Sequence, residues 1–288
     1  MKNIYLSIIL LLLCLNGFSQ KAEQLAFDTD FYDAIDQYVA FTKTLVNTET
    51  EDNKAYTYGF IYIDQIGGIV LRCTGEFELR NDAIFAETII ADPTDIHPLN
   101  KKGVKFHVLS DEHKKQLGLS ERPKWLQTEA SATNKAIYYK NRGLFLNAVG
   151  ASDNAITPLL KAYKIDRHLE GLPYELAYAY NSLGKYKEAI EIATESIKNN
   201  PYRIEIHREL GYAHQNSNNP KLSEEAYLTA LKISKNDDEK SGIALKMTEI
   251  YFKEKDQKKF NEWADKTLEF SNSKPNYVKI IDALRRDF

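Results

Sequence analysis

Cysteine is scarce in this chain, whose 288 residues include only two, Cys14 and Cys73. Cys14 lies in an apolar N-terminal stretch that we expect to be removed, which would leave Cys73 as the only cysteine of the mature protein. A single cysteine excludes an internal disulfide and a zinc site built from paired cysteines. Because Cys73 falls in an alternating apolar pattern, we expect a buried small hydrophobe and not a reactive thiol.

The N-terminal stretch is too short to span a bilayer. Ile4 to Leu15 is mostly apolar, and a helix of about 12 residues covers about 18 Å, against about 30 Å for a bilayer core. Lys2 precedes this run, and Gly17-Phe18-Ser19 follows it. This order is typical of a secretory signal peptide, here residues 1–19, with Gln20 as the mature N-terminus.

Two alternatives to a signal peptide are a membrane anchor, which the short run disfavours, and a lipoprotein. Lipidation of Cys14 would require a small residue before it, and Leu13 stands there. We therefore predict an exported protein, periplasmic or secreted, of a Gram-negative cell envelope, with no membrane span after the signal peptide is cleaved.

The chain lacks the excess of basic residues that a nucleic-acid-binding protein needs, because its formal net charge is −3. The charge is uneven: residues 20–134 hold 12 Lys/Arg and 19 Asp/Glu, a balance of −7, and residues 135–288 hold 25 and 22, a balance of +3. Solvated surfaces on two domains explain this asymmetry; electrostatic docking of one half onto the other or onto a partner is the alternative.

Motifs of catalysis are also missing, since we find no glycine-rich phosphate loop and no nucleophile elbow. His107 and His113 flank acidic residues 111–112, but this spacing matches no known metal-ligand frame. His207 and His214 are seven residues apart on one predicted helix, at positions typical of packing. The sequence therefore predicts no catalytic residue, no cofactor and no metal.

Residues 20–130 are predicted to form a small α+β domain. Apolar residues at helical spacing predict a helix over 30–46. Two strands over 55–63 and 69–80, joined by a turn at Gly67-Gly68, predict a hairpin. Further strands are expected at 83–90 and 103–109, and His97-Pro98 indicates a loop.

Alternation within the hairpin predicts which way its side chains face. Tyr56, Tyr58, Phe60 and Tyr62 should share one face of the first strand. In the second strand one row should face one way, with Gly75 as a possible bulge: Ile69, Leu71, Cys73, Phe77 and Leu79. The opposite row is polar, so we expect an antiparallel sheet with one side in water. Ser110 is expected to cap a short helix that ends before Gly118.

From Asn134 onward the pattern is helical and repeats with a period of 34 residues. The differences 184 − 150 = 34 and 218 − 184 = 34 relate Gly150, Gly184 and Asn218, all of which tolerate left-handed backbone geometry. Three more sets keep this period: Gly143, Ala177 and Gly211; Leu159, Ala193 and Tyr227; Ala162, Ser196 and Ala230.

These registers resemble the tetratricopeptide repeat family, whose repeat is a pair of antiparallel helices. The small residue of the first helix (Ala177), Tyr180, the alanine opening the second helix (Ala155, Ala189) and Pro201 carry the resemblance. It covers about residues 136–270, within a predicted repeat region 131–274. The expected copies are 136–169, 170–203, 204–237 and a degenerate 241–274 after a three-residue slip. A capping helix over 275–288 should keep the end of this helical solenoid soluble.

The resemblance implies a concave groove lined by the first helix of each repeat. Its residues here would be Lys140, Leu144, Asn147 and Ala148, then Tyr174, Tyr178, Asn181 and Ser182, then Glu205, Arg208, Tyr212, Gln215 and Asn216. Some family members grip a terminal carboxylate with lysines and asparagines. Leu144, Glu175, Glu205 and Glu209 occupy those places here, so we reject that activity.

Two functions follow from this sequence. The first is a non-catalytic scaffold that binds a peptide or protein segment in the groove, where flat aromatics, amides and an arginine suit an extended peptide or a partner helix. The alternative is an enzyme or small-ligand-binding module in residues 20–130, with the repeats as a docking arm.

Overall fold

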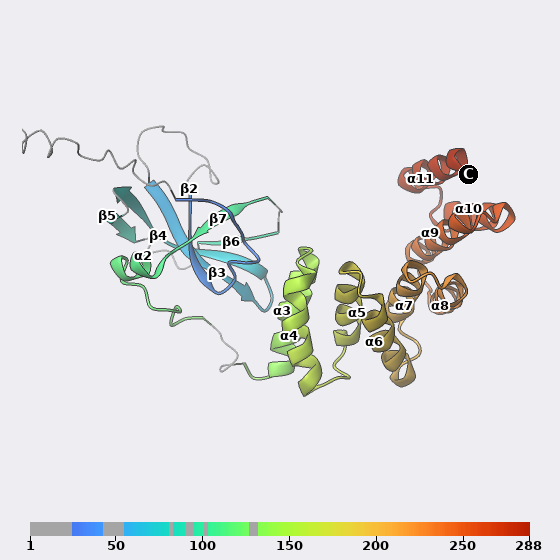
Figure 1. Cartoon of the computed structure of the whole chain (residues 1–288), viewed down its shortest axis with the longest axis horizontal. Helices are drawn as coiled ribbons and strands as arrows, with labels where there is room; N and C mark the ends of the chain where they lie inside the picture. Colours follow the sequence, from blue (N-terminus) through green and yellow to red (C-terminus); the bar gives the residue numbers. More distant parts are fainter. Residues whose placement is uncertain (1–24, 43–54, 81–82, 90–94, 101–102, 127–131) are drawn as a thin grey trace, which may run out of the picture. The chain divides into compact units, whose positions relative to one another are not determined.

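The computed structural model divides the chain into two compact units, residues 1–126 and 127–288, which are described separately (Figure 1). The described residues are 25–42, 55–80, 83–89, 95–100, 103–126 and 132–288. The predicted signal peptide and the predicted domain boundary at 130 lie outside them. Within these residues, no helix combines the length and apolarity that crossing a membrane requires.

The first unit is built on an antiparallel sheet with the strand order β1-β7-β2-β3-β4-β5, and β6 pairs with the first half of β4. Its strands are β1 (Thr29–Asp30), β2 (Gln37–Thr42), β3 (Ala55–Asp64), β4 (Gly68–Arg80), β5 (Ala83–Ile89), β6 (Ile96–Pro98) and β7 (Lys105–Val108). The hairpin of β3 and β4 is confirmed, as are the strands at 83–89 and 105–108. The short helix α2 (Asp111–Gln116) is confirmed too, and Ser110 Oγ caps it by accepting from His113 N at 3.1 Å.

The predicted helix over 30–46 is wrong in its described part. Residues 31–36 form a turn in which Asp36 adopts φ 66°, and Gln37–Thr42 is strand β2. Val39 and Phe41 alternate with Tyr38 and Ala40, yet all four are buried. A strand buried on both faces has apolar residues at every position, so it also satisfies helical spacing.

The centre of the sheet is not wet on either side, contrary to the prediction. Tyr56, Tyr58, Phe60 and Tyr62 do share one face and belong to one core cluster. The residues between them, including Thr57 and Ile61, are buried as well. The hairpin therefore lies in the middle of the sheet, and residues outside the strands, including Leu25, Leu109 and Leu117, pack against its tyrosine face.

A β-bulge in β4 corrects the predicted facing of that strand. Tyr58 pairs with Gly75 and Gly59 pairs with Cys73, so Thr74 is an extra residue without a partner in β3. Beyond the bulge the alternation changes sides. Phe77 and Leu79 join the tyrosine core, whereas Ile69, Leu71 and Cys73 lie on the opposite face. Gly75 is required here, because a Cβ at this position would lie 2.6 Å from Tyr58 Cε1.

The second unit consists of successive helices that pack against their neighbours along the chain (Figure 1). They are α3 (Lys135–Ala148), α4 (Ser152–Ile165), α5 (Leu172–Ser182), α6 (Tyr186–Asn199), α7 (Ile204–Asn216), α8 (Pro220–Ile233), α9 (Asp237–Glu254), α10 (Gln257–Phe270) and α11 (Pro275–Asp287). The first helices of successive pairs also touch, α3 with α5 and α5 with α7.

The turns inside the helix pairs confirm the 34-residue register. Gly150, Gly184 and Asn218 have φ values of 76°, 70° and 61°, the left-handed geometry that the sequence predicted. Lys255 has φ 57° at the turn between α9 and α10. Since 255 − 218 = 37, the fourth pair keeps the register after an insertion of three residues.

The small residues of the first helices are spacers, as predicted. A Cβ at Gly143 would lie 2.3 Å from Leu159 Cγ, and one at Gly211 would lie 2.8 Å from Tyr227 Cε1. In the second pair the equivalent residues, Ala177 and Ala193, are both fully buried. In the first and third pairs, a glycine of the first helix thus makes room for a large side chain of the second helix, and in the second pair both residues are alanine.

The last helix, α11, buries Ile281, and Leu284 packs against the core cluster of α8 to α10. Arg285 Nη2 contacts Asp265 Oδ1 of α10 at 2.6 Å. The apolar side of α11 packs against the preceding helix pair, and its charged side faces water. This arrangement is the one predicted for the terminal helix.

Candidate protein-binding cleft

A cleft of about 440 Å³ opens beside α5, α7, α8 and α9. Five of the predicted groove residues line it together: Tyr178, Asn181, Ser182, Arg208 and Tyr212. The sequence did not predict its remaining lining, which is Glu209, Tyr227, Gly242, Ile243, Leu245 and Lys246. The first helices of two successive pairs and the start of a third thus contribute to one surface.

The cleft combines apolar area with a few polar groups. Tyr178 and Tyr212 are half-buried, and Arg208 is exposed. Arg208 makes no side-chain hydrogen bond or ion pair within the described residues. Lys246, in contrast, is paired with Glu249 at 2.9 Å. Arg208 is therefore the cation of this cleft that is available to a ligand.

Two asparagines of the predicted groove each bond to a glutamate of the next first helix. We call these two Asn–Glu pairs, Asn147–Glu175 and Asn181–Glu209, the ladder. Asn147 Nδ2 donates to the backbone oxygen of Glu175 at 3.0 Å and to its Oε2 at 2.8 Å. Asn181 Nδ2 makes the same two contacts with Glu209, at the same distances. Asn147 is only 4% exposed, so its predicted place on the groove surface is wrong, because its amide joins α3 to α5.

The ladder follows the repeat register. The asparagines are 34 residues apart (181 − 147), as are the glutamates (209 − 175). Burial raises the pKa of both carboxyl groups above the usual range, while the asparagine amide acts in the opposite direction by stabilising the ionised form. The repeat period could have revealed these pairs, because both members recur with it.

The ladder ends where the cleft opens. The next asparagine position is Gln215, and after the three-residue insertion the next glutamate position is 209 + 37 = 246, which is Lys246. Gln215 Oε1 accepts instead from Tyr227 OH at 3.4 Å. Gly242 leaves this side of the cleft open, since a Cβ there would meet no atom within 4 Å.

The other predicted groove residues lie outside the lining of this cleft. Lys140 Nζ donates to Glu170 O at 3.3 Å, and Asn216 Nδ2 donates within its own helix to Tyr212 O at 2.9 Å. Leu144 is half-buried on α3. Tyr174 is half-buried and its ring centroid is 6.3 Å from that of Tyr178.

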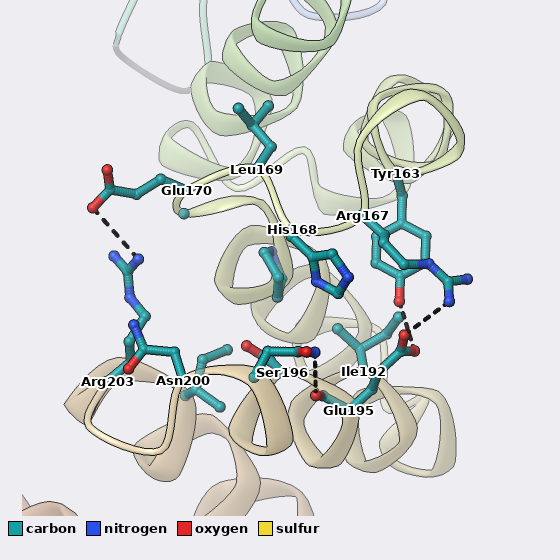
Figure 2. A pocket seen from close by; sticks show the side chains of 14 residues that line it. Tyr163, Arg167, His168, Leu169, Glu170, Ile192, Glu195, Ser196, Asn200 and Arg203 are labelled. Atoms are coloured by element: carbon teal, nitrogen blue, oxygen red, sulfur yellow. Dashed lines mark hydrogen bonds and ion pairs between the residues drawn. The ribbon is translucent and has the colours of Figure 1, made fainter.

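A second cleft of about 270 Å³ lies between the C-terminal ends of α4 and α6 and the starts of α5 and α7, and Figure 2 shows its charged side chains. Glu195 accepts from Tyr163 OH at 2.8 Å and pairs with Arg167 at 3.1 Å. Arg203 contacts Glu170 at 3.5 Å. Its glutamates and arginines are thus paired with one another, as expected where neighbouring helix pairs pack together.

The two histidines of α7 lie at packing positions, as predicted. His207 is buried and its Nε2 lies 2.8 Å from Pro201 O. His214 is half-buried, and desolvation lowers its pKa. Cys73, in the other unit, is 6% exposed, which confirms the predicted burial. Burial and then Asp95 raise the pKa of its thiol to about 12, so it is not an activated nucleophile.

Comparison with known proteins places one repeat in a family. Residues 174–203 match the tetratricopeptide repeat model, which confirms the resemblance for the second predicted copy. No protein of curated function matches the sequence.

Solved structures with similar coordinates cover about half of the chain. The crystal structure of MamA is 18% identical, with a TM-score of 0.46 over 52% of this chain and 85% of that one. TTC0263, a thermophilic TPR protein in Thermus thermophilus, is 12% identical, with a TM-score of 0.47 over 54% and 84%. Pseudomonas aeruginosa pilF is 19% identical, with a TM-score of 0.30 over 47% and 76%. Likeness at this level carries no functional argument.

Proposed function

The chain carries a tetratricopeptide repeat at 174–203, and from this premise we propose that residues 131–288 form a repeat solenoid that binds another protein. In this proposal the protein is a non-catalytic scaffold, and the cleft between α5, α7 and α9 holds a peptide or a partner helix. The observation that carries it is the cleft of about 440 Å³ in which Tyr178, Arg208 and Tyr212 come together.

The composition of this cleft resembles that of binding hot spots. Tyrosine and arginine are enriched at such sites. Tyrosine buries a large area with only two side-chain torsions, and arginine offers several donors in a planar group. The hydroxyl group of Ser182, which is exposed, can pair with the backbone of an extended segment. Asn181 is buried and bonded to Glu209, so it supports the cleft from within. Arg208 would favour an acidic side chain on the partner.

The ladder explains why binding is proposed at this point of the repeat array. Between α3 and α5, and between α5 and α7, buried Asn–Glu pairs connect the first helices. Between α7 and α9 the corresponding residues are Gln215 and Lys246, and a cavity lies there instead. A partner segment can therefore enter beside α9 without breaking a buried hydrogen bond.

Photocrosslinking tests the proposed cleft with a matched pair of tyrosines. A photoreactive phenylalanine analogue replaces Tyr212 in the full chain, which is then irradiated in an extract of the source organism. Tyr202 is the control site, because it is 78% exposed and does not line the cleft. We expect a crosslinked partner from position 212 only; equal products from both positions would contradict the proposal.

Gly242 offers a way to block the cleft without harming the fold. Gly242→Leu should fill the space beside α9 and abolish the crosslink. It should also stabilise α9 by about 0.5–1 kcal/mol, since glycine is unfavourable inside a helix. Gly242→Ala is the control, because it shares the helical gain and adds only one methyl group. An unchanged crosslink in the Leu variant would place the partner elsewhere.

Export to the cell envelope is part of this proposal. It is supported by the N-terminal pattern of Lys2, a run of about 12 mostly apolar residues and small residues before Gln20. N-terminal sequencing of the protein isolated from its native cells should begin at Gln20. A protein that retains Met1 and stays with the cytosolic fraction would refute export and leave the cleft proposal intact.

A further inference from the structure

Three side chains with different metal-binding atoms meet on the first unit's sheet. Cys73 N donates to Asp95 O at 3.0 Å, and two residues further along Leu71 pairs with His97. Because side chains alternate along a strand, Cys73, Asp95 and His97 project from the same face. One sulfur, one carboxylate oxygen and one imidazole nitrogen from these residues lie within 4.8 Å of one another.

The exposed fraction of the side chains increases from Cys73 to Asp95 to His97. Cys73 is 6% exposed, whereas the side chains of Asp95 and His97 are 32% and 42% exposed. His97 Nε2 lies 2.7 Å from Asp95 Oδ1. The sulfur therefore forms the inner end of the cluster, and the other two groups are open to solvent and to an entering ion.

The bulge at Thr74 determines that the cysteine faces this cluster. If residues 73–77 formed a regular strand without the bulge, Cys73 would project on the same side as Phe77, into the tyrosine core. The bulge also falls where the outer partner of β4 changes from β6, which pairs with residues 70–72, to β5, which pairs from Gly75 onward. Bulges commonly redirect a side chain toward a functional site.

We propose that Cys73, Asp95 and His97 bind a divalent transition metal, with zinc as the favoured ion. Thiolate, imidazole and carboxylate are the three ligand types of zinc sites, and the sulfur and nitrogen disfavour calcium and magnesium. On binding, the thiol proton leaves to solvent and a sulfur–metal bond forms. Three protein ligands leave the fourth tetrahedral position for water or another ligand.

The spacing of the donors fits such a site after a small adjustment. Metal–ligand bonds of about 2.0–2.3 Å in a tetrahedron place neighbouring donor atoms about 3.3–3.8 Å apart. The donor atoms lie within 4.8 Å of one another, so the widest pair must close by at most about 1 Å. The His97 Nε2–Asp95 Oδ1 pair, at 2.7 Å, must open by about 0.6 Å. The side chains of His97 and Asp95 are partly exposed and can adjust more easily than the buried Cys73.

Cobalt titration of the full-length, tag-free protein tests the site directly. Co²⁺ bound by a thiolate gives a sulfur-to-metal charge-transfer band in the near ultraviolet, and tetrahedral geometry gives intense visible bands. We expect one equivalent of Co²⁺ to produce both, and Zn²⁺ to displace it. The visible bands report geometry, and the ultraviolet band identifies the sulfur.

Variants assign the ligands. Cys73→Ser is nearly isosteric and should abolish the charge-transfer band, and His97→Ala should weaken binding by about 100-fold or more, because loss of even an outer partner costs about 10–100-fold. His168→Ala is the control, since His168 is an exposed histidine of the other unit. Circular dichroism verifies that each variant is folded, and the half-exposed His97 makes its variant the safer one.

Two results would overturn the proposal. One is the absence of the charge-transfer band in the wild-type protein at excess Co²⁺, which would leave the cluster as a hydrogen-bonded group without a metal. The other is a band that persists in Cys73→Ser, or binding that falls as much in His168→Ala as in His97→Ala. Neither outcome bears on the cleft of the helical unit.

Discussion

Removal of the Asn181 amide should destabilise the helical unit in a pH-dependent way. In Asn181→Ala, Glu209 loses a bond to its backbone oxygen and a bond to its carboxylate. The first is worth about 0.5–1.5 kcal/mol and the second, to a charged group, about 1.5–3 kcal/mol. Alanine has a higher helix propensity than asparagine, which offsets about 0.5 kcal/mol of this loss in the free energy of unfolding. We expect a net loss of about 1.5–4 kcal/mol at neutral pH.

The sign of the pH dependence follows from the raised pKa of Glu209. Burial raises this pKa above the value in the unfolded chain, so the native state binds more protons and stability falls as the pH rises through that window. The asparagine amide counteracts the effect by stabilising the ionised form. Its loss raises the pKa further, so the Asn181→Ala defect should be largest at neutral pH and smaller in mild acid.

Urea unfolding of the full chain, followed by the helical circular dichroism signal at neutral pH and in mild acid, measures both effects. With an m value of about 2 kcal/mol/M, the midpoint at neutral pH should fall by about 1–2 M. Asn199→Ala is the control, because Asn199 is exposed and its amide donates within its own helix to Glu195 O at 3.1 Å. Equal losses in the two variants, or a loss that does not change with pH, would refute the pairing of Asn181 with an ionised Glu209.

Two further predictions concern the spacer positions and the buried thiol. Ala177→Leu should overpack the fully buried contact region of α5 and α6 and cost about 1–3 kcal/mol, measured as a lower melting temperature. An unchanged melting temperature would mean that the assigned repeat register is wrong. Cys73, being buried with a raised thiol pKa, should react slowly with a thiol reagent in the folded protein and rapidly in denaturant. Rapid modification without denaturant would contradict its burial.

The helical unit could be predicted well because its constraints are local and recur. A left-handed turn accepts glycine or asparagine at low cost, so Gly150, Gly184 and Asn218 marked the helix pairs directly. Closely packed helices demand a small residue, which Gly143 and Gly211 supplied. Lys255 could be assigned only from the structure, since nothing in its side chain favours left-handed geometry.

The sheet unit was predicted less well because its constraints are non-local. The segment 37–42 has apolar residues at successive positions, a pattern that suits a buried helix as well as a strand buried on both faces. The bulge at Thr74 reversed the facing of everything beyond it, and a single extra residue leaves no mark on composition. Asp95 and His97 lie more than twenty residues from Cys73, so only the pairing of β4 with β6 brings the three together.

The candidate cleft is found where the repeat is least regular, and this has a physical reason. Between α3 and α5, and between α5 and α7, an Asn–Glu pair bonds each first helix to the next. The three additional residues at the start of α9, after the Asn236 cap, shift the following helix and place Lys246 where the glutamate would stand. Lys246 pairs instead with Glu249 on its own helix, and the gap that remains is lined by Tyr178, Arg208 and Gly242. Regular positions thus identified the fold, whereas departures from the period mark the surface that we propose as the binding site for a partner.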